Sequence, residues 1–153
     1  MPGSMLEQPA QRSIAAVASP ASPDLQRFVR STLGCKCPDD VFQSVTIDRC
    51  DHQMRLVIGN RLLIYVMETT LEPPAAKTVS RLVEQGLADR NSQRLNRFRL
   101  VVACPQPSPG LASAKAAFAA VVGDDDRAHL HVVCTDELPA ELRPSTLTSI
   151  DFR

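Results

Sequence analysis

Runs of apolar residues alternate with amphipathic segments through the second half of the chain. The expected elements, in chain order, are a strand at 61–67, a helix at about 74–86, a strand at 98–104, a helix from Ser108 to Val122 and a strand at 128–134. The middle strand is apolar apart from Arg99, which is typical of a strand covered on both faces. This β-α-β-α-β order predicts parallel strands joined by right-handed crossovers.

A helix that begins after Ser22 opens the patterned part of the chain. Ser22 is a favourable N-cap residue, and Pro23 suits the first helical position. Gly34 supplies the left-handed residue that commonly ends a helix. The apolar residues that share one face between these ends are Leu25, Phe28, Val29 and Leu33.

Two shorter apolar runs lie between this helix and the alternating half. Strands are expected at about 43–49 and 54–58, with a turn from Cys50 to Gln53 between them. Gly59-Asn60 then separates two apolar runs by two residues, which predicts a tight hairpin. The competing interpretation is one long strand with a bulge at Gly59.

Together these elements predict an α/β fold: a single three-layer α/β/α domain with a mixed sheet of about five strands. The parallel half would be joined at one edge by the N-terminal helix and an antiparallel hairpin. Residues 1–21 are rich in Pro, Ser, Ala and Gln and are expected to be a flexible leader. Residues 22–138 would form the domain, and residues 139–153 a flexible tail.

Composition narrows the classes of function. The 153 residues carry 17 basic and 17 acidic side chains, so the formal net charge is zero, which argues against a dedicated nucleic-acid binder. No run of about 18 apolar residues is present, so no membrane span is expected, and a cytoplasmic location is the default. Five cysteines are an odd number, which in a reducing compartment favours free thiols or metal ligands over a disulfide framework.

Cys35-x-Cys37 is the sharpest local pattern for chemistry. Two thiolates one residue apart suit a soft metal such as Zn(II) or Cu(I). Structural zinc sites usually have a gap of about two to four residues within a pair and four ligands in total, so this spacing is short. The residues that could complete a ligand set are Cys50, His52, Cys104 and Cys134.

Thiol chemistry at Cys35 and Cys37 is the second interpretation of this motif. Cys35 follows the carboxyl end of a predicted helix, whose negative dipole end disfavours a thiolate, and Asp39 and Asp40 add to that effect. Lys36 acts in the opposite direction. The Cys-x-x-Cys pattern of thioredoxins is absent, and Cys50-Asp51-His52 resembles a catalytic Cys–His pair only superficially, because neighbours in a turn rarely face each other.

Two further groups of polar residues stand out. His129-x-His131 lies on the last predicted strand, where period-two alternation puts both imidazoles on one face, either as metal ligands or as part of a half-exposed polar face. A loop at 90–97 and the start of the next strand hold four arginines: Arg90, Arg94, Arg97 and Arg99. These could contact an anion or RNA, or could pair with Asp89 and Glu84 within the chain, and we favour the second interpretation.

These observations leave three hypotheses of different classes. The first is a non-catalytic binding or accessory module with soft-metal or thiol chemistry at Cys35 and Cys37. The second is a thiol-dependent or anion-handling enzyme with a pocket at the carboxyl ends of the parallel strands, at residues 68–70, 104–108 and 134–136. The third is a structural subunit that meets a protein partner or a second copy of itself.

Overall fold

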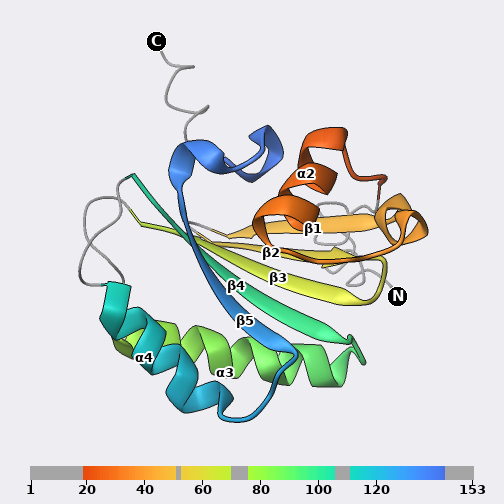
Figure 1. The fold of residues 1–153 in the computed structure, drawn as a ribbon. Coiled ribbons are helices and arrows are strands. Elements are labelled where there is room, and N and C mark those ends of the chain that lie inside the picture. Colours follow the sequence, from red (N-terminus) through yellow and green to blue (C-terminus); the bar gives the residue numbers. More distant parts are fainter. Residues whose placement is uncertain (1–18, 51–52, 70–75, 106–110, 144–153) are drawn as a thin grey trace, which may run out of the picture.

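The computed structural model describes residues 19–50, 53–69, 76–105 and 111–143, and they form one five-stranded mixed sheet with helices packed against it (Figure 1). The predicted α/β class is therefore confirmed. The strands lie in sequence order, β1-β2-β3-β4-β5. Their bounds are β1 (Val45–Cys50), β2 (Gln53–Ile58), β3 (Leu62–Glu68), β4 (Arg97–Cys104) and β5 (Ala128–Cys134).

β1, β2 and β3 form an antiparallel meander. The predicted hairpin at Gly59-Asn60 is confirmed, but its loop has three residues rather than two, because Ile58 pairs with Leu62 and Arg61 also lies in the turn. Gly59 and Asn60 have positive φ values of 60° and 56°. Gly59 is required here for a second reason: a Cβ at this position would lie 2.5 Å from the Cγ1 of Val41. Burial alternates along β2, as expected for a strand with one face turned toward the core.

β3, β4 and β5 pair in parallel, as the alternating second half predicts. β4 lies between the other two, and every residue in it after Arg97 is buried, which accounts for its continuous apolar sequence. The crossovers include the helices α3 (Ala76–Ser92) and α4 (Leu111–Val122), which lie against the same face of the sheet (Figure 1).

The predicted end of the first crossover helix at Gly86 is wrong, because α3 continues through Gly86 to Ser92. The physical reason is packing against β4: a Cβ at Gly86 would lie 2.2 Å from the Cζ of Phe98. Gly86 is therefore a close-approach residue inside the helix rather than a helix end. Gly123, with a φ of 60°, does follow the last residue of α4, as predicted. The predicted helix starts at residues 74 and 108 lie outside the described residues.

The opposite face of the sheet packs against the N-terminal helix. α2 (Pro23–Arg27) continues into a π-helical turn, η2 (Phe28–Thr32), and the predicted cap is confirmed because the Ser22 hydroxyl accepts a hydrogen bond from the Leu25 N–H at 3.1 Å. A short 3₁₀ helix, η3 (Asp39–Gln43), follows. The buried residues that these segments place against the sheet are Leu25, Phe28, Val29, Leu33, Cys35, Val41 and Phe42.

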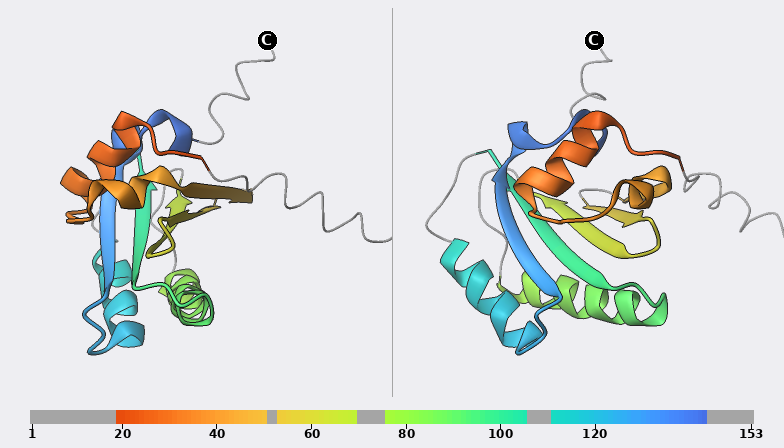
Figure 2. Two further views of the ribbon diagram at one scale, coloured as in Figure 1. Left: turned by 90° about the vertical axis from the view of Figure 1, so that its right-hand side faces the viewer. Right: turned by 45° about the vertical axis from the view of Figure 1, so that its right-hand side comes forward.

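The packed part of the chain extends beyond the predicted limits of 22 and 138. At the start, the N–H and C=O of Ser19 both pair with Val45, at 2.9 and 2.7 Å. At the end, the 3₁₀ helix η5 (Ala140–Leu142) buries Leu142 completely beside α2 and η2 (Figure 2). An apolar pair four residues apart, Leu138 and Leu142, fills the core here. No helix within the described ranges has the length and apolar character that a membrane crossing requires.

Candidate functional site

The Cys-x-Cys motif lies where the N-terminal helical segment turns back toward the sheet. Gly34, with a φ of 71°, reverses the chain, and the Cys35 N–H then donates to the Val29 carbonyl at 3.1 Å. Cys35 and Cys37 are joined by a disulfide with a Cα–Cα distance of 5.6 Å. The composition favoured free thiols or metal ligands, whereas the structure pairs these two cysteines with each other. Cys35 is buried and Cys37 is half-buried.

Cys50 is not brought to this motif. It is the last residue of β1 and pairs with Gln53, whereas Val45, at the other end of β1, pairs with Ile58 next to the Gly59 turn. Five residues of extended strand separate these ends, about 17 Å. His52 lies outside the described residues. Within the described ranges, no group of three or more His, Cys, Asp or Glu side chains is arranged to hold a metal ion.

A surface hollow of about 360 Å³ adjoins the disulfide. It lies at the amino-terminal edge of the parallel strands, and three cationic side chains and no carboxylate line it: Lys36, Arg61 and Arg97. Asp39, expected to disfavour a Cys35 thiolate, is paired with Arg30 at 2.6 Å. The same guanidinium donates to the Cys37 carbonyl at 2.9 Å. The neighbourhood of Cys37 is thus more cationic than the sequence suggested.

The two cysteines at the carboxyl ends of β4 and β5 are register partners, Cys104 and Cys134, and both are free thiols. Cys104 is buried and Cys134 is half-buried. Burial, followed by the nearby carboxylates of Glu137 and Asp136, raises the pKa of Cys134 above that of an ordinary thiol. This environment favours a neutral, unreactive thiol.

The enzyme hypothesis places a pocket at this carboxyl edge. Of its residues, 68–69, 104–105 and 134–136 are described, and they do not line any of the four surface cavities considered for a site. Residue 70 and residues 106–108 lie outside the described residues.

The histidines of β5 contribute to packing on the face covered by the N-terminal helix. His131 Nε2 lies 2.8 Å from Arg99 Nη1, and the same Arg99 nitrogen donates to the Leu33 carbonyl at 2.8 Å. Burial, with smaller contributions from the charges of Arg99 and His129, lowers the pKa of His131 to about 4. His131 is therefore neutral at pH 7 and accepts a hydrogen bond from Arg99, which does not suit a chelating pair.

The arginines around residues 90–99 do not form one basic loop. Arg90 is buried at the end of α3 and pairs with Asp125 at 2.7 Å, and Arg99 is buried beneath Leu33. Arg94 and Arg97 are exposed. The expected internal pairing holds for Arg90, but its partner is Asp125 rather than Asp89 or Glu84.

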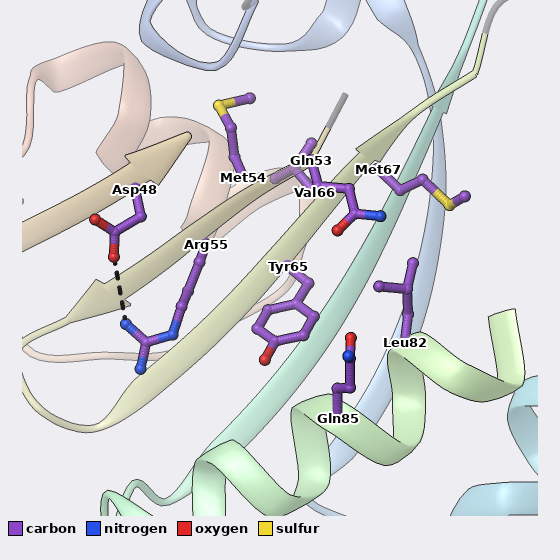
Figure 3. A pocket seen from close by; sticks show the side chains of 9 residues that line it. All are labelled: Asp48, Gln53, Met54, Arg55, Tyr65, Val66, Met67, Leu82 and Gln85. Atoms are coloured by element: carbon purple, nitrogen blue, oxygen red, sulfur yellow. Dashed lines mark ion pairs between the residues drawn. The ribbon is translucent and has the colours of Figure 1, made fainter. Parts of the chain in front are cut away.

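Asp89 belongs to a polar network that sequence reasoning missed. The Arg55 side chain donates two hydrogen bonds to the Asp89 carboxylate, from Nε at 2.7 Å and from Nη2 at 2.8 Å. The Tyr65 hydroxyl donates a third hydrogen bond to it at 2.7 Å. The hydrogen bonds from Arg55 lower the pKa of Asp89, and burial raises the pKa of Tyr65. A cavity of about 220 Å³ lies over this part of the sheet, with Arg55, Tyr65 and Gln85 around it (Figure 3). Arg55 and Tyr65 are register partners on β2 and β3, and Asp89 comes from α3, so no local spacing in the sequence predicts this contact.

Comparisons with protein-family models, with curated proteins and with solved structures found no match to this chain.

Proposed function

We propose that the protein is a small accessory module that exchanges electrons with thiols through the Cys35–Cys37 disulfide. The observation that carries the proposal is the placement of this disulfide beside a hollow lined by Lys36, Arg61 and Arg97. Positive charge near a cysteine stabilises its thiolate, which is the form that attacks or leaves in thiol–disulfide exchange. We also infer a cytoplasmic protein whose sheet is the middle layer of a three-layer α/β/α sandwich.

The reductant in the proposed reaction is a low-molecular-weight thiol or a protein dithiol. Its thiolate attacks Sγ of Cys37, the Sγ–Sγ bond breaks, and the electron pair of that bond leaves on Sγ of Cys35, which takes up a proton. A second thiolate of the reductant then attacks the reductant's own sulfur in the mixed disulfide and releases Cys37, which is also protonated. Two reductant thiols are thereby oxidised to a disulfide, and one disulfide of this chain is reduced to two thiols.

The unequal burial of the two cysteines supports Cys37 as the sulfur that is attacked. Cys35 is only 6% exposed and belongs to the core, whereas Cys37 packs at its boundary. The Arg30 side chain donates a hydrogen bond to the Cys37 carbonyl and forms an ion pair with Asp39. An accessible sulfur next to a buried partner is the arrangement expected of an exchange centre, because access limits which sulfur reacts.

A trapping experiment tests this proposal on the full chain. Cys35→Ser and Cys37→Ser variants are incubated with glutathione disulfide, and the mixed disulfides are located by peptide mass spectrometry. We expect Cys37 in the Cys35→Ser variant to be glutathionylated at least about tenfold faster than Cys35 in the Cys37→Ser variant. Cys104→Ser is the matched control and should leave the reduction of the wild-type 35–37 disulfide by dithiothreitol unchanged. Equal trapping of both variants, or no reversible reduction at these positions, contradicts the proposal.

A soft-metal centre at the same two cysteines is the second candidate, favoured by sulfurs that are within bonding distance of each other. Once reduced, Cys35 and Cys37 would supply two thiolates for Zn(II) or Cu(I). Cys50 lies at the end of β1 that is remote from the Gly59 turn, so further metal ligands would have to come from other residues. Elemental analysis of anaerobically purified, untagged protein, with thiol titration before and after chelation, decides this; less than about a tenth of an equivalent of metal excludes it.

A further inference from the structure

A second hollow, of about 400 Å³, lies at the amino-terminal edge of the parallel strands and collects residues from three separate segments of the chain. The turn before β3 contributes Asn60 and Arg61, and the segment before β5 contributes Arg127. The other residues come from the end of α3 and the loop that leads to β4: Asn91, Arg94, Leu95 and Asn96.

Hydrogen-bond donors dominate the lining of this hollow. Three arginines and three asparagines line it, and no carboxylate does. In the part of the chain that the structure describes, no ion pair joins Arg61, Arg94 or Arg127 to a carboxylate. The Arg127 N–H donates to Asp125 at 2.9 Å, and the charges of these two residues also interact. The Arg127 side chain donates to the Asn96 amide oxygen at 3.3 Å.

The backbone at Arg94 adds an observation that is independent of charge. Arg94 has a φ of 58° two residues after the end of α3, where a left-handed conformation favours glycine. Asn60 has a φ of 56°, and these two are the non-glycine residues with positive φ within the described ranges. Both line this hollow. Strained backbone conformations of this kind gather at functional sites, so these two residues favour a site here.

We infer that this hollow is a binding site for a small phosphate-bearing ligand. Guanidinium groups bind oxyanions with paired, charge-assisted hydrogen bonds, and amide groups add further donors. Because donors from three separate segments line the hollow, they suit a phosphate group, with its three or more acceptor oxygens, better than a carboxylate, which has two. Arg61 and Asn96 also line the hollow beside the disulfide, but the inference does not depend on thiol chemistry.

Binding is measured by isothermal titration calorimetry of the full chain with inorganic phosphate, pyrophosphate and AMP. Succinate, whose anionic groups are carboxylates, is the control ligand. The key variant is Arg94→Gly, which removes the guanidinium and relieves the backbone strain. We expect it to weaken binding of the preferred phosphate compound at least tenfold while the melting temperature stays unchanged or rises. Arg81→Gln is the matched control: Arg81 is an exposed arginine of α3 outside this hollow, so its loss should change affinity less than twofold.

The arms of the titration also identify the source of the phosphate group. Preference for AMP indicates a nucleotide, and preference for pyrophosphate or inorganic phosphate indicates a free phosphate compound; either outcome supports the site. Three outcomes overturn the inference: no binding of any phosphate compound, succinate binding as tightly as the phosphates, or equal losses of affinity in Arg94→Gly and Arg81→Gln.

Discussion

Arg99 Nη1 lies 2.8 Å from His131 Nε2 on neighbouring strands, beneath the carboxyl end of the N-terminal helical segment. The same nitrogen donates to the Leu33 carbonyl, so one buried arginine ties the sheet to the end of that segment. A cation at this end of a helix is electrostatically favourable. The arrangement makes His131 a structural acceptor that must stay neutral.

The first prediction concerns the stability of the fold below neutral pH. The folded pKa of His131 is about 4, against an ordinary value of 6.5, so the unfolded chain binds more protons between these values. The contribution of His131 to the free energy of unfolding therefore rises with pH through this window and is lost as the pH falls from 6.5 to 4. One proton limits the slope to about 1.4 kcal/mol per pH unit, and residual solvent contact at this half-buried site reduces it further.

Urea unfolding between pH 4 and 7 measures this dependence. His131→Gln should flatten the profile, whereas His129→Gln, on the same strand and face, should leave most of it in place. Asp89 and Asp125 have pKa values lowered from 3.8, so their contribution is lost below this window and does not obscure it. A profile that His131→Gln leaves unchanged would show that another group is responsible.

The second prediction concerns Gly86 in the middle of α3. Helix propensity alone predicts that Gly86→Ala stabilises the protein by about 0.5–1 kcal/mol. The Phe98 ring occupies the position of the new methyl group, so we expect destabilisation by about 1–3 kcal/mol instead. Thermal or urea unfolding gives the sign. Adding Phe98→Leu to Gly86→Ala should recover part of the loss, and strictly additive effects would contradict the packing argument.

The third prediction concerns the ion pair between Arg55 and Asp89. Asp89→Asn removes the charge that accepts two hydrogen bonds from Arg55 and one from Tyr65, and we expect a loss of about 1.5–3 kcal/mol in unfolding free energy. Asp48→Asn is the matched control, because Asp48 lies 3.7 Å from Arg55 and is more exposed, so its loss should be below about 0.5 kcal/mol. Similar losses of unfolding free energy in the two variants would contradict the argument that the hydrogen bonds to Asp89 stabilise the fold.

The fourth prediction concerns the two thiols at the carboxyl ends of β4 and β5. Cys104 is buried and the pKa of Cys134 is raised, so both should react with N-ethylmaleimide at pH 7 far more slowly than in the urea-unfolded chain. We expect at least about tenfold protection of Cys104 and a smaller protection of Cys134. Time-resolved alkylation read by mass spectrometry distinguishes the two. Unfolded-like rates at Cys104 would indicate that this strand end opens readily.

The local patterns predicted most of the secondary structure because they act within a few residues. The Ser22 cap and the Gly59-Asn60 turn are short-range features, and the continuous apolar sequence of β4 marks a strand with two covered faces. The parallel order of β3, β4 and β5 followed from the helices between them. The prediction at Gly86 was wrong because glycine is typical of a helix end. The true reason for glycine is its close contact with Phe98, and this residue belongs to another element, so local sequence does not show the contact.

The candidate sites depended on contacts that only the folded chain makes. By itself, the sequence marked Cys35 and Cys37 as the sharpest motif, since the two residues are neighbours whatever the fold. The tertiary structure decided that Cys50 lies at the far end of β1 and that Arg99 meets His131. It also decided that Arg61, Arg94 and Arg127 gather around one hollow. The physical reason is that spacing along the chain governs capping and turns, whereas burial and charge pairing depend on which distant segments the sheet brings together.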